Sequence, residues 1–272
     1  MASVDDANIK FWNELCGTNL ATVLGITDSS PESLKKFDDW FFEFYPYLLE
    51  YVSLTELTGR DVLEVGLGYG SLSQKIAESG ARYVGLDIAL GPVEMVCHRL
   101  RQAALAGDAK QGSIVEAPFS DNSFDYIVAI GCLHHTGDMR KGIDECRRLL
   151  RAGGSLIAMV YYAYSYRRWV QAPSQTLGYL VSEILGYRGV LVPRTTQEKW
   201  YYDHNSMGMA APHTDFVSVK SLRNYCRLFS DFHWQRRNID QEPSFRTRTR
   251  PELLASRWPG FCGLEIYMRA IK

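Results

Sequence analysis

Length, composition and charge are those of an ordinary globular protein. The chain has 272 residues, of which 46% are hydrophobic and 22% charged. Its net charge of −1 argues against a dedicated nucleic-acid-binding protein, because such proteins cluster positive charge. The six cysteines include no Cys-x-x-Cys pair, which favours reduced thiols. No segment approaches the ~20 apolar residues of a membrane span or resembles a signal peptide, so we expect a cytoplasmic protein.

The middle of the chain alternates strand patterns with helix patterns. Short apolar runs indicate strands, and runs with helical spacing lie between them; Ser71 is expected to cap the first helix. Such alternation implies right-handed crossovers and a doubly wound parallel sheet, an α/β fold. Two later strands are expected to form a hairpin-like edge. The predicted strands are 61–65, 83–87, 124–130, 155–160, 232–239 and 263–271, and the predicted helices are 71–80, 92–104 and 139–150.

The remaining segments divide the chain into four regions. Residues 1–57 carry an aromatic-rich stretch that indicates an N-terminal helical lid or packing against the sheet. Residues 58–162 hold the regular strand–helix alternation and form the core. Residues 163–215 lack that alternation and are expected to be an inserted cap. Residues 216–272 return to the core with the last two strands.

A glycine run marks the first strand-to-helix turn. Residues 64–70 read Glu-Val-Gly-Leu-Gly-Tyr-Gly, and Gly66 and Gly68 let the backbone approach a ligand closely. The run lacks the G-x-G-x-x-G spacing of a dinucleotide fold and the Lys-Ser/Thr pair of a phosphate loop. Asp87 ends the next strand, where a carboxylate can accept hydrogen bonds from ribose hydroxyls. The alternative for Asp87 is the N-cap of the following helix.

With these residues the chain resembles the class I S-adenosylmethionine-dependent methyltransferases, particularly the small-molecule methylases. The matching segments are 62–70, 84–87, 112–119, 122–126, 130–135 and 148–156. The resemblance implies a Rossmann-like, seven-stranded doubly wound sheet with S-adenosyl-L-methionine as cofactor. It differs at Gly112-Ser113, where the family commonly has Gly-Asp. The residues that it assigns to cofactor binding are Glu64, Gly66, Gly68, Gly70, Asp87, Ile88, Ser113, Ile114 and Gly131.

These assignments imply separate roles around the cofactor. Glu64 and the Gly66 backbone would hold the methionine half and Asp87 the ribose. Ile88 would pack on the adenine face, with Ser113 and Ile114 at its edge. Gly131 would lie beside the sulfonium. The site must also place the methyl group in line with a nucleophile.

Histidines and tyrosines are the candidates for the acceptor side. His134 and His135 follow the strand nearest the methyl group, and family members place the His135 position near the acceptor; a structural hydrogen bond is the alternative. The cap supplies further candidates, for which helix capping and packing are the alternative. No Cys/His/Asp group has metal-ligand spacing, so we expect no metal. The catalytic candidates are His135, His213 and Tyr201, and the substrate-binding candidates are Tyr202, His204 and Tyr162.

The C-terminal part is basic. Arg236 and Arg237 are followed by arginines at alternate positions, Arg246, Arg248 and Arg250. Such residues on an extended segment could clamp a carboxylate or phosphate. A solvated surface is the more common outcome for such a run.

We therefore expect methyl transfer to an O, N or C nucleophile of a small organic acceptor with an aromatic or apolar portion, in which an anionic group is allowed. One alternative is a tRNA wobble-base methyltransferase, because residues 134–135 and 151–154 are also similar to wobble-uridine methylases. The other is a non-catalytic cofactor-binding scaffold subunit. No nucleic-acid partner is expected, and a homodimer is left open.

Overall fold

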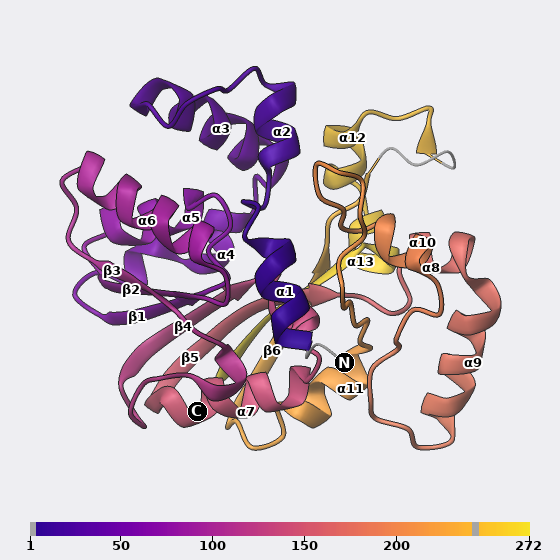
Figure 1. Cartoon of the computed structure of the whole chain (residues 1–272). Helices are drawn as coiled ribbons and strands as arrows, with labels where there is room; N and C mark the ends of the chain where they lie inside the picture. Colours follow the sequence, from indigo (N-terminus) through magenta and orange to yellow (C-terminus); the bar gives the residue numbers. More distant parts are fainter. Residues whose placement is uncertain (1–3, 241–244) are drawn as a thin grey trace.

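The computed structural model describes residues 4–240 and 245–272. Its centre is one seven-stranded sheet of order β3-β2-β1-β4-β5-β7-β6 (Figure 1). This α/β architecture confirms the predicted fold class. The strands are β1 (Asp61–Val65), β2 (Arg82–Asp87), β3 (Asp108–Gln111), β4 (Phe124–Ile130), β5 (Leu150–Tyr161), β6 (Asp231–Arg237) and β7 (Glu265–Ile271).

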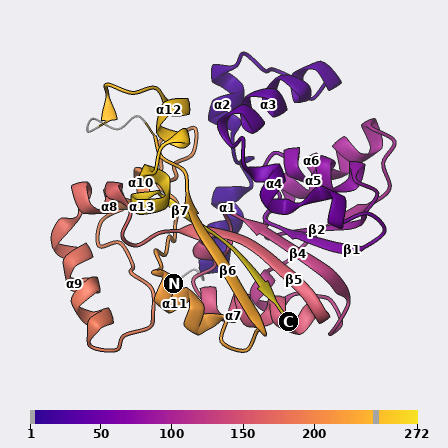
Figure 2. The same cartoon turned by 180° about the vertical axis from the view of Figure 1, so that it is seen from behind.

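Strands β1 to β5 run parallel, and β7 reverses the direction. β7 lies between β5 and β6 and is antiparallel to both, with Tyr161 opposite Glu265 and Ser155 opposite Ile271. The prediction that the last two strands pair is confirmed. They are not a tight hairpin, however, because α12 (Arg250–Ala255) and α13 (Trp258–Cys262) lie between them in the chain. Figure 2 shows β6 and β7 together at this side of the sheet.

Helices cover both faces of the sheet. One buried apolar cluster joins the sheet to α7 (Met139–Leu149) and to α11 (Val219–Tyr225). A second joins it to α4 (Leu48–Val52), α5 (Ser71–Glu78) and α6 (Leu90–Gln102). The expected cap at Ser71 is wrong by one residue. Gly70 occupies the N-cap with φ 79° and no side-chain cap bond, a left-handed conformation that glycine adopts without a steric cost.

The N-terminal region is helical, as expected. It contains α1 (Val4–Trp12), α2 (Thr18–Val23), α3 (Pro31–Phe44), α4 and a short 3₁₀ turn (Leu54–Glu56), and α2 and α3 stand above α5 and α6 in Figure 1. Arg99 of α6 anchors α3. Its fully buried guanidinium donates two 2.9 Å hydrogen bonds to Asp38 and one of 2.7 Å to the Tyr69 carbonyl, which ties α3 to the glycine turn at residues 66–70.

The region 163–215 contains the helices α8 (Tyr166–Gln171), α9 (Pro173–Ile184) and α10 (Thr196–Trp200).

Two arginines of the basic C-terminal part contact other residues of the protein and are not free to clamp a ligand. Arg250 lies 3.5 Å from the centre of the Phe44 ring and donates to the Phe44 carbonyl at 2.6 Å. Arg236 donates to the Tyr162 hydroxyl and the Phe261 carbonyl. Among the described residues, no helix is long and apolar enough to cross a membrane.

Candidate active site

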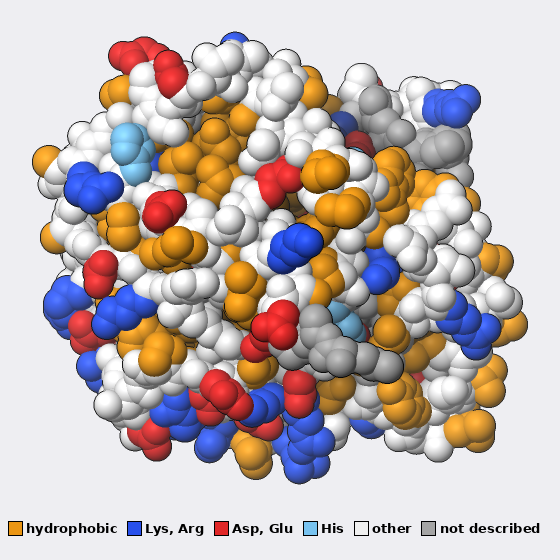
Figure 3. Space-filling model, in the orientation of Figure 1, with side chains coloured by type: hydrophobic (Ala, Val, Ile, Leu, Met, Phe, Trp, Pro, Cys, Tyr) orange, Lys and Arg blue, Asp and Glu red, His pale blue; other side chains and the backbone are white. Residues whose placement is uncertain are grey.

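A cavity of about 420 Å³ opens where β1, β2 and β4 end, the edge at which open α/β sheets bind ligands. Its size is in the range of small-molecule sites. Figure 3 shows apolar side chains gathered below the N-terminal helices on this face. Eight of the nine predicted cofactor residues line the cavity: Glu64, Gly66, Gly68, Asp87, Ile88, Ser113, Ile114 and Gly131. Gly70 does not line it; a Cβ there would lie 2.8 Å from the Arg99 side chain.

The glycine turn keeps the cavity floor free of side chains. Gly66 has φ 79°, and a Cβ there would lie 2.5 Å from the Cβ of Cys132. Gly68 has φ 53°, and a Cβ there would meet only Cys16, at 3.6 Å. The first glycine is therefore required by packing and conformation. The second leaves open space beside the cavity, as a backbone-bound ligand requires.

Asp87 is held rigidly at the end of β2. Its carboxylate accepts hydrogen bonds from the backbone amides of Leu67 at 2.7 Å and Ala89 at 2.9 Å. Burial raises its pKa to about 6, against the opposing effect of these amides. Ala89, rather than Asp87, occupies the N-cap of α6. The remaining lone pairs of a carboxylate that lines the cavity are positioned to accept hydroxyl groups.

Glu64, the penultimate residue of β1, is a second buried acid. Its Oε2 accepts the Tyr83 hydroxyl at 2.7 Å. Burial raises the pKa of Glu64 to about 7, while hydrogen bonds from Ser73 and Tyr83 act in the opposite direction. A positively charged ligand would stabilise the ionised form of this buried carboxylate and would in turn be bound by it.

The cavity wall is acidic and carries an unpartnered donor. Asp5, Glu64, Asp87 and Asp203 line it, whereas no Lys or Arg does within the described part of the chain. The buried hydroxyl of Ser71, also on the wall, has no hydrogen-bond partner. Negative charge, free hydroxyl-binding capacity and a bare glycine floor fit S-adenosylmethionine, whose sulfonium and ammonium groups are cationic and whose ribose bears hydroxyls.

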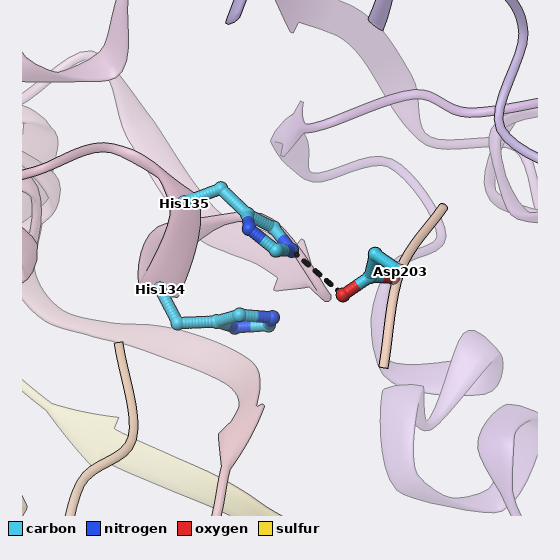
Figure 4. A group of neighbouring side chains, drawn as sticks. All are labelled: His134, His135 and Asp203. Carbon is cyan, nitrogen blue, oxygen red and sulfur yellow. Dashed lines mark ion pairs between the residues drawn. The ribbon is translucent and has the colours of Figure 1, made fainter. Parts of the chain in front are cut away.

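His135 faces the other end of the cavity. It is 4% exposed, and its ring lies 4.9 Å from that of Trp12. Its Nδ1 lies 2.7 Å from the carbonyl oxygen of His213, so Nδ1 is the donor. Its Nε2 lies 3.5 Å from Oδ2 of Asp203, as Figure 4 shows.

His134 is wholly buried beside it. Its ring lies 4.2 Å from that of His135 and 4.0 Å from that of Tyr161, and neither ring nitrogen has a hydrogen-bond partner. Burial holds its pKa well below the usual value. The hydroxyl of Tyr161 donates to Asp203 at 3.1 Å, which joins these residues into one group.

Five other residues expected near the acceptor, four from the cap and Tyr162 from the end of the core, do not line the cavity, although all five are described. Tyr201 is 41% exposed and its hydroxyl accepts from Gln197. The other four lie behind or beside the wall: Tyr202 packs against Tyr161, His204 stacks on Trp200, His213 offers its carbonyl to His135, and Tyr162 binds Arg236.

Other residues line the cavity instead. The cap contributes Asp203, which is adjacent to the candidates but was not among them. The N-terminal helices contribute the apolar wall: Trp12, Cys16, Leu20, Phe37, Trp40, Phe41, Tyr45 and Leu48. The aromatic stretch of the lid was the sequence signal for part of this wall, although spacing did not separate a lid from core packing.

Known proteins match the core of the chain. A profile of the family described as "Methyltransferase domain" matches residues 63–158. A protein of Mycolicibacterium smegmatis named "Probable S-adenosylmethionine-dependent methyltransferase" is 36% identical over 35% of this chain and 36% of its own length. A ubiquinone biosynthesis O-methyltransferase of Paraburkholderia phymatum is 30% identical over 47% of this chain and 62% of its own. The chain thus spans less than two thirds of either relative.

Solved structures agree on the fold. An S-adenosylmethionine-dependent methyltransferase from Mesorhizobium loti superposes with a TM-score of 0.54 at 16% identity, over 83% of this chain and 97% of that one. The glycine turn and the acidic residues Glu64 and Asp87 lie within the residues 63–158 that the family profile matches. Residues 63–158 therefore match a methyltransferase domain, and the fold of the chain is similar to that of a solved S-adenosylmethionine-dependent methyltransferase.

Proposed function

We propose that the protein transfers the methyl group of S-adenosylmethionine to an oxygen nucleophile on a small, neutral acceptor that contains a ring. The observation that carries this proposal is the continuity of the cavity. One wall bears Glu64, Asp87 and the glycine turn, and the other bears aromatic side chains together with His135 and Asp203. Cofactor and acceptor can therefore meet without crossing solvent.

The bound cofactor supplies an electrophilic methyl group on a positively charged sulfur. Glu64 and Asp87 bind and orient its polar groups. Trp12, Trp40 and Phe41 exclude water and pack against an apolar ring, so that positioning supplies much of the rate acceleration. His135 and Asp203 are polar side chains that line the cavity; they place the nucleophilic oxygen, and the Asp203 carboxylate takes up the proton that this oxygen loses when the methyl group is transferred to it.

The acceptor class rests on the wall and on one relative. Because no Lys or Arg lines the cavity among the described residues, an anionic group on the acceptor would find no cation there, and we favour a neutral acceptor over an anionic one. The O-methyltransferase name of the Paraburkholderia relative supports an oxygen nucleophile.

The test is release of S-adenosylhomocysteine in the presence of phenols, catechols and hydroquinones, with mass spectrometry to detect the methylated product. We expect turnover with at least one of them, and loss of turnover in Asp87→Asn. Cofactor binding without product from any acceptor class, tRNA included, would support the scaffold alternative. Stimulation by tRNA alone would support the wobble-base alternative.

A further inference from the structure

We infer that His134, His135 and Asp203 form a binding site for a divalent transition-metal ion at the acceptor end of the cavity. Each residue offers one ligand atom, and these atoms lie within 4.8 Å of one another. The two histidines come from the 3₁₀ turn Leu133–His135 after β4, and Asp203 comes from the cap opposite. Figure 4 shows His135 directed at Asp203, with the His134 ring alongside.

The unsatisfied atoms in this cluster are the first argument. His134 is 0% exposed and neither of its nitrogens has a partner. Oδ2 of Asp203 also lacks a hydrogen bond. Buried polar atoms are nearly always paired. The ring nitrogens of His134 and Oδ2 of Asp203 lie close together without partners, which indicates a ligand that accepts their lone pairs. A metal ion bound by imidazole and carboxylate is such a ligand.

The orientation of His135 is the second argument. Because Nδ1 donates to the His213 carbonyl, Nε2 directs its lone pair toward Oδ2 of Asp203, 3.5 Å away. Two lone pairs that face each other need a cation between them, either a proton on Nε2 or a metal ion, and a metal ion would also supply a partner for the buried nitrogens of His134. Two ligands ~2.1 Å from a tetrahedral metal lie ~3.4 Å apart, so the separation already suits one. The carbonyl behind His135 is the kind of partner that orients metal-binding histidines.

The donor set points to the kind of metal. Two imidazole nitrogens and one carboxylate oxygen suit zinc, iron(II) or manganese better than magnesium or calcium. His135 and Asp203 line the cavity, so open coordination positions would face the acceptor. If the proposed function holds, the acceptor's oxygen would bind the metal there and release its proton more easily. Metal binding itself does not depend on that proposal.

The experiment uses the full chain after treatment with a chelator. Cobalt(II) is titrated while the visible d–d absorption is followed, and zinc binding is measured by calorimetry. We expect binding of about one equivalent and a loss of affinity of at least ~10-fold in both Asp203→Asn and His134→Gln. The matched control is His233→Ala, because exposed His233 pairs with Asp231 at 2.8 Å away from the cavity; we expect wild-type affinity.

Binding of S-adenosylhomocysteine is measured in the same proteins to keep the two proposals apart. We expect it to survive in Asp203→Asn, since the cofactor wall is formed by other residues. No cobalt absorption, or equal metal affinity in wild type and Asp203→Asn, would overturn the metal site; the second result stands even if His134→Gln does not fold. Metal binding without S-adenosylhomocysteine binding would instead refute the proposed function alone.

Discussion

Asp87 offers the sharpest test of how the cofactor is held. Asp87→Asn keeps the shape of the side chain but removes its charge and one acceptor. Because two backbone amides already point at the carboxylate, the new amide nitrogen must also face one of these donors. A hydrogen bond to a charged group contributes ~1.5–3 kcal/mol. We therefore expect S-adenosylmethionine to bind ~10–150-fold more weakly, by ~1.4 kcal/mol per tenfold.

The pH dependence of binding provides an internal check. Ribose hydroxyls donate to the ionised form of Asp87, so a proton on the carboxylate competes with them. Since burial raises the pKa of Asp87 to about 6, wild-type affinity should fall as the pH falls through that value, and the variant should lack this decrease. Burial raises the pKa of Glu64 to about 7, and the charge of Asp87 adds to that rise. The contribution of Glu64 to the pH profile should therefore remain in the variant and move to lower pH. Calorimetry at several pH values that showed equal affinities and equal pH profiles would refute the ribose assignment.

Three further changes test the surroundings of the site. Gly66→Ala should abolish cofactor binding in calorimetry. The control is Gly153→Ala, which has a similar φ of 76° but nothing within 4 Å of the new Cβ, and it should lower the free energy of unfolding in urea by only ~1–2 kcal/mol. Equal effects of the two variants on binding and on stability would show that backbone strain alone matters. Asp38→Asn should lower the free energy of unfolding by ~3 kcal/mol, because it leaves the buried charge of Arg99 unpaired; a change below ~0.5 kcal/mol would count against that anchor. Burial raises the pKa of Glu265 to about 7, so the free energy of unfolding should fall as the pH rises from 4.5 to 7, because Glu265 loses its proton at lower pH in the unfolded chain than in the folded one. Glu265→Gln should therefore be up to ~3 kcal/mol more stable than wild type at pH 8 and lose that advantage near pH 5. A difference in urea unfolding that is the same at both pH values would contradict this.

The strands that the sequence predicts correctly are the buried ones, because a buried strand appears in the sequence as a short run of apolar residues. β1 and β4 are apolar runs with clear ends, and their predicted bounds match the structure. β3 was not located, because only Ala109 of its four residues is buried. β3 lies at the edge of the sheet and is mostly exposed, so its sequence lacks the apolar run from which a strand is predicted.

The site divides in the same way. One wall of the cavity is built from a single strand–turn–helix motif, so spacing and resemblance predict functional residues such as Gly66 and Asp87, which do line the cavity; their binding of the cofactor stays a prediction. The acceptor wall is assembled by tertiary packing of segments far apart in the chain, and Trp12 meets His135 only there. Within the cap, Asp203 lines the cavity, whereas Tyr201 and His204 are exposed. No local sequence pattern predicts which of these neighbouring residues lines the cavity.

The position of β7 has a consequence for synthesis on the ribosome. β5 can complete its pairing only with residues 265–271, and β6 reaches the sheet only through β7. Until this last strand has left the exit tunnel, one edge of β5 keeps its backbone groups unpaired beside apolar side chains such as Leu156 and Val160. Such an edge invites pairing with other chains. Chaperone binding to the β5 edge would therefore matter most while synthesis proceeds from β5 to residue 271.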